Sequence, residues 1–231
     1  MLKLDGPRLE PRGTAPTSLV VLLHGYGANG DDLIALGDGW RRWLPEAVFV
    51  APNAPEAIPG MYGGLQWFPL TLRDPSEYWR GVVSAQPAVD AFIDEQLARY
   101  RLPAGRLVLV GFSQGTMMAL HVGLRRAAAP AGIVGYSGLL AGPEHLAEIT
   151  ARPPILLIHG EADDLIPVAA LHAAREQLAK SDLLVEWHVR PGVGHGIDPE
   201  GQIMAGHFIA SALRGPATPL TQGKFPCMPA T

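Results

Sequence analysis

The sequence contains a single cysteine, Cys227, near its carboxyl end. One thiol cannot form a disulfide within the chain, and it cannot supply the several thiolates of a cysteine-rich metal site. A chain without disulfides fits a reducing compartment, so we expect a cytoplasmic location. Residues 1–16 mix charged residues with prolines and contain no apolar run, so no secretory signal is predicted there.

Charge is also scarce, because charged residues make up 17% of the sequence and the formal net charge is -4. No run of Lys or Arg is long enough to follow a phosphate backbone, so nucleic acid is not an expected partner. The longest apolar stretches, such as 19–23 and 155–158, are far shorter than the roughly 20 residues of a membrane-spanning helix. No membrane span is therefore predicted.

Cofactor motifs are missing as well. The glycines near residue 30 are not followed by the Gly-Lys-Ser/Thr ending of a phosphate-binding loop. The adjacent carboxylates Asp31 and Asp32 have no histidine at ligand spacing, and helix capping explains them better than a metal does. We therefore predict neither a nucleotide cofactor nor a metal.

Hydrophobic residues, by contrast, make up 48% of the sequence. They form short runs of strand length that alternate with segments of helical length and period. The strand-like runs are Leu19–His24, Ala47–Ala51, Arg106–Val110, Ile133–Tyr136, Ile155–His159 and Leu183–Val189. The helix-like segments are Val89–Tyr100, Gln114–Arg126, Pro143–Ile149, Val168–Lys180 and Glu200–Leu213. This alternation predicts an α/β fold, with a mostly parallel sheet flanked by helices.

The domain organisation is expected to be simple. The length suits one domain over residues 1–213, and the proline-rich residues 214–231 are expected to form a tail outside it. Residues 52–80 interrupt the alternation, because they combine prolines and glycines with aromatic residues that follow no clean period. A loop of that length either covers a site or packs its aromatic side chains on the flank of the domain, and both alternatives stay open.

Residues Gly111-Phe112-Ser113-Gln114-Gly115 follow an apolar strand-like run and precede a helical segment. The pattern G-x-S-x-G between a strand and a helix is typical of a nucleophile elbow, which exposes the serine hydroxyl. Glycine is needed on both sides because a side chain would crowd the neighbouring strand and helix, while the serine adopts a strained backbone conformation. A serine hydroxyl also needs a base and an acid to become an effective nucleophile.

His195 is the predicted base. In this arrangement the acid and then the histidine follow the serine along the chain. His195 lies in a glycine-rich loop after a predicted strand, where a side chain can project over the carboxyl edge of the sheet. The other late histidines, His172, His188 and His207, fall inside predicted helices or a strand, where packed or solvated roles are expected.

The predicted acid lies in the loop after the run 155–158, which carries Glu161, Asp163 and Asp164. Asp163 is our choice and Asp164 is the alternative. Either aspartate can instead cap the following helix, and spacing alone does not separate the two.

Two backbone amides are candidates for an oxyanion hole. His24-Gly25-Tyr26-Gly27 follows the first strong strand and places the Tyr26 N–H where a donor is needed, although an ordinary strand-ending turn is the alternative. The second candidate is the Gln114 N–H, because the first amide of a helix has no partner within the helix.

Taken together, these motifs resemble the phospholipase/carboxylesterase family, which includes acyl-protein thioesterases and small bacterial carboxylesterases. The resemblance covers roughly residues 19–213. The motifs that carry it are, in chain order, Leu-Leu-His24-Gly25-Tyr26-Gly27-Ala-Asn-Gly-Asp-Asp, Gln66-Trp67-Phe68, Gly111-Phe-Ser113-Gln-Gly115, His159-Gly-Glu-Ala-Asp163 and Gly194-His195-Gly196.

The resemblance implies an α/β-hydrolase fold without a large lid and without a cofactor. It implies hydrolysis of carboxylic esters, lysophospholipids or S-acyl thioesters, with a preference for short to medium acyl chains. It assigns the catalytic triad to Ser113, Asp163 and His195. The oxyanion amides map onto Tyr26 and Gln114, and the acyl groove onto Leu65, Gln66, Trp67 and Phe68.

The chain departs from the family at two places. Many relatives carry Asp and then Pro where this sequence has Glu161 and Asp164, which keeps Asp164 open as the acid. The tail over 214–231 has no counterpart in the family pattern.

The expected partner is a small-molecule ester or acyl substrate. A peptidase or transacylase can use the same triad, and a binding protein can retain the fold without turnover. The complete set of serine, acid and histidine favours an enzyme, and the chain has no additional domain that would select peptides. A homodimer is expected if Trp40, Trp43 and Trp79 form an exposed apolar patch, and burial of each within the monomer is the alternative.

Overall fold

The structure is a computed structural model that describes residues 3–11, 13, 15–71, 74 and 76–215. Most of the predicted tail, including Cys227, lies outside the described residues. The end of the predicted domain at residue 213 falls one residue before the end of the last helix, α5 (Pro199–Arg214).

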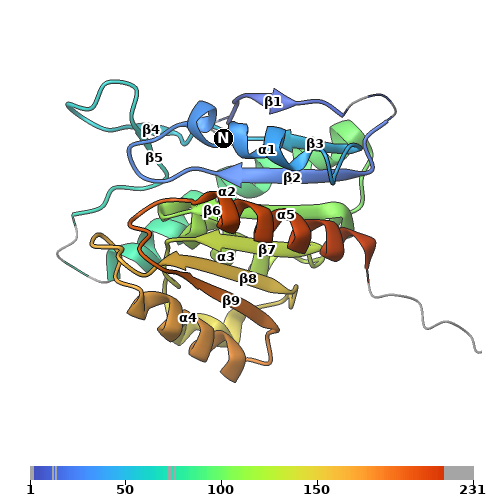
Figure 1. The fold of residues 1–231 in the computed structure, drawn as a ribbon. Helices are drawn as coiled ribbons and strands as arrows, with labels where there is room; N and C mark the ends of the chain where they lie inside the picture. The colour runs from blue at the N-terminus through green and yellow to red at the C-terminus, as the bar shows by residue number, and fades with distance from the viewer. Residues whose placement is uncertain (1–2, 12, 14, 72–73, 75, 216–231) are drawn as a thin grey trace, which may run out of the picture.

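A seven-stranded sheet forms the centre of the molecule, with strand order β1-β3-β2-β6-β7-β8-β9 (Figure 1). Every neighbouring pair is parallel except β1 with β3, which is antiparallel. The strands are β1 (Arg8–Leu9), β2 (Ser18–Leu23), β3 (Ala47–Val50), β6 (Leu107–Phe112), β7 (Gly132–Tyr136), β8 (Ile155–Gly160) and β9 (Val185–Arg190). The mostly parallel sheet is therefore confirmed.

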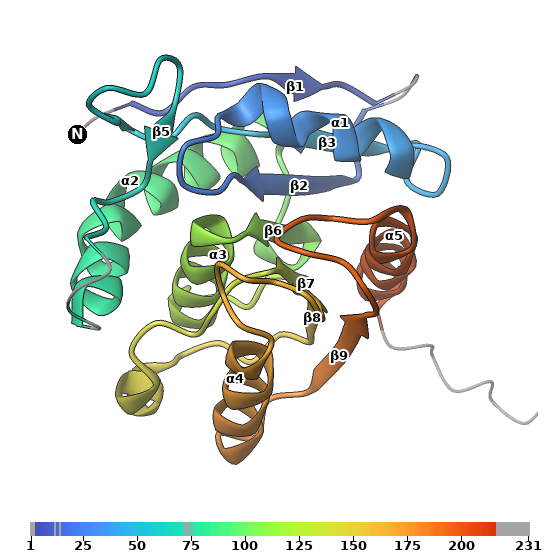
Figure 2. The ribbon, with the colours of Figure 1, turned by 60° about the vertical axis from the view of Figure 1, so that its left-hand side comes forward.

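Helices cover both faces of this sheet (Figure 2). On one face, α1 (Gly30–Trp40) and α5 pack over the sheet. On the other face lie α2 (Ser76–Tyr100), α3 (Gln114–Arg125) and α4 (Ala169–Lys180). The 3-10 helices are η1 (Ala104–Arg106) and η2 (Pro143–Glu148). Because both faces are covered, the central strands are almost continuously apolar, which is what made them recognisable in the sequence.

The structure contains more helix than was predicted at two places, after β2 and at the end of the predicted loop over residues 52–80. Helix α1 was not among the predicted helical segments, although helix capping was expected at Asp31 and Asp32. It begins with a capping box in which Asn29 and Asp32 exchange side-chain and backbone hydrogen bonds. Helix α2 starts at Ser76 and continues through Pro87, whereas the prediction began at Val89. Its buried face overrides the helix-breaking tendency of proline.

The remaining part of the predicted loop contains a small hairpin of β4 (Glu56–Ala57) and β5 (Leu65–Gln66).

In the part of the chain that the structure describes, no helix combines the length and apolarity needed to cross a membrane.

The three tryptophans considered for a dimer surface are engaged within the monomer. Trp40 is 0% exposed, and its indole Nε1–H donates to the Gln202 carbonyl oxygen at 2.8 Å. Trp43 is half-buried beneath the Arg42 guanidinium, and the half-buried Trp79 is stacked on the His145 ring. Burial within the monomer is therefore confirmed for Trp40, and a homodimer stays a prediction.

Candidate active site

Ser113 lies in the turn between β6 and α3, with φ 54° and ψ -115°. A non-glycine residue with this backbone conformation is strained by about 1–3 kcal/mol. A β-carbon on Gly111 would lie 2.2 Å from the Gly115 carbonyl oxygen, and one on Gly115 would lie 1.8 Å from the Leu23 carbonyl oxygen. The predicted strained serine and the need for both flanking glycines are therefore confirmed by the geometry.

Three predicted residues from separate loops converge at the carboxyl ends of the parallel strands. His195 Nε2 lies 3.0 Å from Ser113 Oγ, and His195 Nδ1 lies 2.8 Å from Asp163 Oδ2. A carboxylate accepts hydrogen bonds, so the imidazole proton belongs on Nδ1. Nε2 is then free to accept the serine proton, which is the arrangement a general base requires.

Asp163 is completely enclosed, with a side chain that is 0% exposed. Its Oδ1 accepts backbone N–H groups from Leu165 at 3.0 Å and from Ile166 at 2.8 Å. Burial alone would raise the pKa of this carboxyl, but the Ile166 N–H and His195 outweigh burial and hold the pKa below its ordinary value. The lowered pKa favours the charged form of Asp163. Asp164, by contrast, is exposed.

His159 also faces the buried carboxylate and was not predicted to belong to the site. Its Nε2 lies 3.2 Å from Asp163 Oδ2 and 2.8 Å from the Ile166 carbonyl oxygen. Because a carbonyl accepts, Nε2 carries the proton. The signal was present in the sequence, since His159 opens the same motif that contains Asp163, but periodicity assigned it to the strand.

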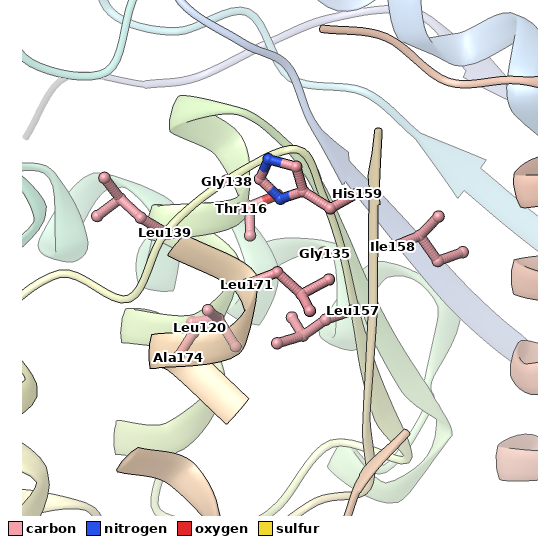
Figure 3. Close-up of a pocket in the computed structure, with 10 residues that line it drawn as sticks. All are labelled: Thr116, Leu120, Gly135, Gly138, Leu139, Leu157, Ile158, His159, Leu171 and Ala174. Carbon is pink, nitrogen blue, oxygen red and sulfur yellow. The ribbon is translucent and has the colours of Figure 1, made fainter. Parts of the chain in front are cut away.

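A small cavity lies beside His159, lined also by Thr116, Leu139 and Leu171 (Figure 3). Its volume is about 10 Å³. A cavity of that size is close to the minimum of roughly 10–15 Å³ that accommodates one water. It therefore does not hold an acyl chain.

The two predicted oxyanion donors are free to receive a ligand. Among the described residues, neither the Tyr26 N–H nor the Gln114 N–H donates to a protein acceptor. Gln114 is the first residue of α3, so its amide also lies at the positive end of the helix dipole. The assignment of the Tyr26 and Gln114 amides as oxyanion donors stays a prediction.

His24 fixes the orientation of the first of these donors. The Ala54 N–H donates to His24 Nε2 at 2.9 Å, so the proton is on Nδ1, which donates to the Gly25 carbonyl oxygen at 2.8 Å. In a trans peptide the carbonyl and the next N–H point in opposite directions, so the Tyr26 N–H points away from His24. Burial lowers the pKa of His24 and keeps the ring neutral for this role.

The predicted acyl-groove segment lies deeper than expected. Trp67 and Phe68 are 1% and 2% exposed, Gln66 is buried, and Leu65 alone of the four is half-buried. The aromatic rings join the core under α2, where burial of their large apolar area is most favourable. Trp67 and Phe68 therefore do not face an open groove in this structure, and Leu65 is the member of the predicted segment that reaches the surface.

The Gln114 side chain connects this segment to the nucleophile turn. Its Oε1 accepts the Trp67 N–H at 2.9 Å, and its Nε2 donates to the Phe68 carbonyl oxygen at 2.8 Å. Both polar ends of a side chain that is 1% exposed are thus satisfied.

The other late histidines lie away from the triad. His172 packs on Trp187, His188 lies beside Glu186, and His207 packs on Trp43. Within the described ranges, no group of three or more His, Cys, Asp or Glu residues is arranged to hold a metal ion.

Comparison with known proteins places this geometry in context. A family model described as phospholipase/carboxylesterase matches residues 4–213. The crystal structure of esterase PE8 is 44% identical, with a TM-score of 0.88, and the match covers 92% of this chain and 100% of that one. An acyl-protein thioesterase 1 from Neurospora crassa is 29% identical, covering 82% of this chain and 84% of the relative. One from Schizosaccharomyces pombe is 27% identical, covering 93% and 99%.

Proposed function

Since the chain belongs to the phospholipase/carboxylesterase family, we propose that it is a serine carboxylesterase acting on short to medium-chain carboxylic esters. The fold is that of the α/β-hydrolases, and hydrolase activity of the serine esterase type follows from the family. The proposal concerns the substrate range and the residues that perform the reaction.

The observation that carries the proposal is the continuous hydrogen-bonded path from Asp163 through His195 to Ser113. Ser113 Oγ attacks the ester carbonyl carbon while His195 Nε2 takes the hydroxyl proton. The carbonyl oxygen becomes an oxyanion, which the Tyr26 and Gln114 amides stabilise. Each such donor typically contributes about 3 kcal/mol to the transition state.

Collapse of the tetrahedral intermediate breaks the bond to the alcohol oxygen, which receives the proton from His195. Ser113 retains the acyl group. A water molecule then attacks the acyl carbon, gives its proton to His195 and releases the carboxylic acid, with Ser113 recovering its own proton. The buried Asp163 stabilises the imidazolium at both steps.

The preference for short to medium acyl chains is supported by the walls near Ser113. The cavity beside His159 is only about 10 Å³, and the aromatic residues of the 65–68 segment are packed into the core. A long chain would therefore stay largely in water, where further methylene groups gain little binding energy.

S-acyl thioesters are a second candidate substrate class, because the relatives from Neurospora crassa and Schizosaccharomyces pombe are acyl-protein thioesterases. The same attack and the same oxyanion donors serve a thioester. A thiolate is a better leaving group than an alkoxide, so proton transfer from His195 contributes less to that step.

Hydrolysis of p-nitrophenyl esters from acetate to palmitate, by the wild type and by Ser113→Ala, tests the proposal. A thioester series of matched chain length is run in parallel, and circular dichroism checks that the variant is folded. We expect serine-dependent turnover with an optimum below the long chains. Turnover of thioesters alone would support the second candidate, and an optimum at palmitate would contradict the proposed chain length.

A further inference from the structure

Strand β9 forms one end of the sheet and differs from the strand beside it (Figure 1). Every residue of β8 is buried, whereas each residue of β9 is half-buried or exposed. In the part of the chain that the structure describes, no strand pairs with the outer edge of β9. An unpaired edge offers its backbone N–H and C=O groups to another strand, and the proposed reaction gives this edge no role.

Apolar surface lies on both sides of this edge. Leu184, directly before the strand, is 78% exposed, and Trp187 near its centre is 38% exposed. A groove of about 960 Å³ on the α5 side is lined in part by Met204 and Phe208. A groove of about 640 Å³ on the α4 side is lined in part by Leu183 and Trp187. A strand placed against β9 would therefore meet apolar side chains on either face.

The residues of β9 that direct their backbone groups outward can be identified. The carbonyl oxygens of Leu184 and Arg190 accept N–H groups from the β8 side, so these residues face inward. Along a regular strand, successive residues direct their hydrogen-bonding groups to opposite edges, and the pairing of β8 with β9 is continuous. Val185, Trp187 and Val189 therefore direct their N–H and C=O groups to the outer edge.

These outward groups match a second copy of the same strand. Two copies of β9 can pair antiparallel about a two-fold axis that passes beside Trp187. Val185 then lies opposite Val189 of the second copy, and Trp187 lies opposite its own equivalent. Each of these pairs can exchange both of its N–H···O=C bonds, because all the residues involved face outward.

Neighbouring registers fit less well. An axis beside His188 places Val185 opposite Pro191, which has no N–H to donate. An axis beside Glu186 places two carboxylates directly opposite each other, which is unfavourable in a sheet. The backbone and the charges of the strand therefore favour the axis at Trp187.

The same register also matches the side chains. Trp187 packs on α4, so the two tryptophans and the Val185–Val189 pairs share that face of the extended sheet. On the α5 face, Glu186 lies opposite His188 of the second copy. These two side chains already attract each other within one chain, where His188 Nε2 lies 3.0 Å from Glu186 Oε1. Aromatic, β-branched and complementary polar pairs all stabilise neighbouring strands.

We propose that β9 is the interface of a homodimer, in which a second copy of this chain extends the sheet antiparallel with Trp187 beside the two-fold axis. Two isolated strands pair only marginally, so the exposed Leu184 and the apolar grooves on both faces contribute to the contact. Residues 216–231 are a poorer occupant of the edge, because they contain four prolines, which lack the N–H that a ladder needs. The homodimer expected from the sequence thus uses β9 and not the tryptophans first considered.

Light scattering after size-exclusion chromatography, over a range of concentrations of the full chain, tests the proposal. We expect the wild type to have twice the mass of one chain. Trp187→Lys and Trp187→Glu each place like charges opposite each other, so each should raise the dissociation constant of the dimer at least about tenfold. An equimolar mixture of the two variants should restore the dimer, because the lysine then faces the glutamate.

Val83→Lys is the matched control, with circular dichroism as the check that every variant is folded. Val83 is 43% exposed and lies on α2, away from β9 (Figure 2). It carries the same substitution at an apolar residue of similar exposure, and it should leave the dimer intact.

Cysteine cross-linking tests the register in a Cys227→Ser background. Trp187→Cys should link the two copies under mild oxidation, because Cα atoms of a directly opposite hydrogen-bonded pair lie about 5.5 Å apart, within the range of a disulfide. His188→Cys is the neighbouring control. Its equivalents lie diagonally, about 7–8 Å apart, so it should link poorly.

Several results would overturn the inference, and none of them depends on turnover. A monomeric wild type would do so, as would a dimer that both Trp187 variants leave intact. Cross-linking through His188→Cys and not through Trp187→Cys would refute the register. A monomer in which the Val185 and Trp187 amides exchange slowly with deuterium would make residues 216–231, and not a second copy, the occupant of the edge.

Discussion

Replacing Asp163 by Asn gives a sharp test of the triad, because the structure fixes which way the new amide must point. Oδ1 accepts two backbone N–H groups, from Leu165 and Ile166. The asparagine must keep its carbonyl oxygen at that position, since an NH₂ group there would face two donors. The amide nitrogen therefore takes the place of Oδ2, opposite the His195 and His159 rings.

At that place the NH₂ group reverses the tautomer of His195. It lies about where Oδ2 is now, 2.8 Å from His195 Nδ1, and it can only donate to that nitrogen. The imidazole proton moves to Nε2, which then donates to Ser113 Oγ and can no longer accept its proton. The same NH₂ group faces the protonated Nε2 of His159, now 3.2 Å from the carboxylate, with no proton acceptor between them.

The expected loss is large and specific to this aspartate. A wrong tautomer lowers kcat about 10⁴-fold, which corresponds to about 5 kcal/mol in the activation barrier. The assay is kcat/KM on the best p-nitrophenyl ester, with circular dichroism and thermal unfolding as checks on the fold. Asp164→Asn is the matched control, because Asp164 is exposed one residue further along the same loop. A folded Asp163→Asn variant within tenfold of wild type, or an equal loss in Asp164→Asn, would refute the assignment.

Three further predictions concern stability. Ser113→Gly should be more stable to urea than Ser113→Ala by about 1 kcal/mol, because glycine relieves the positive-φ strain that alanine retains; equal midpoints would contradict the strain. Gly115→Ala should yield little folded protein, since its β-carbon would meet the Leu23 carbonyl oxygen at 1.8 Å, whereas Gly105→Ala, with open space around it, should fold normally. Burial lowers the pKa of His121 from 6.5 to about 4. The unfolded chain therefore binds that proton first, and the free energy of unfolding should fall by up to about 3 kcal/mol as pH drops from about 6.5 to 4. Urea titrations of His121→Leu should lack this part of the pH dependence.

The central strands were predictable because their sequence carries the physical cause of their position. Strands buried on both faces must be apolar along their whole length, so β2, β6, β7 and β8 stand out without any structural information. The two-residue strand β1 is too short to show a period.

Helix α1 was harder to predict because several of its residues have a low helix propensity. It contains three glycines, and glycine lowers helix propensity. Gly37 is nevertheless required, since a β-carbon there would lie 2.9 Å from the Phe49 ring. The close approach of helix and strand is a tertiary requirement, and it is not visible in the local pattern.

At the site, the sequence predicted residue types and their order better than their depth. Ser113 could be identified because it lies directly after the buried strand β6, and His195 because it lies in the glycine-rich loop that follows β9. Parallel strands bring their carboxyl ends to one edge of the sheet. The choice of Asp163 over Asp164 depends on which carboxylate the backbone of the loop encloses, and residue spacing does not encode that. Trp67 and Phe68 were predicted to line a groove but are buried in the core. The sequence alone does not show whether an aromatic side chain in a loop faces a groove or packs into the core beneath the loop.

The hydrogen bonds that hold the proposed oxyanion donors were not predicted from the sequence. They distinguish substitutions that should slow all substrates from substitutions that should change selectivity. The proposed oxyanion donors are held by His24 and by the Gln114 side chain, which are 0% and 1% exposed and engaged with backbone groups. Such donors are preorganised, so they treat every carbonyl oxygen alike whatever is attached to it. A substitution at His24 that leaves the neighbouring Trp67 in place should therefore lower kcat/KM by a similar factor for esters of different acyl chain length. Discrimination between substrates is expected to come from residues beside the proposed donors, such as Leu65 in the proposed acyl groove.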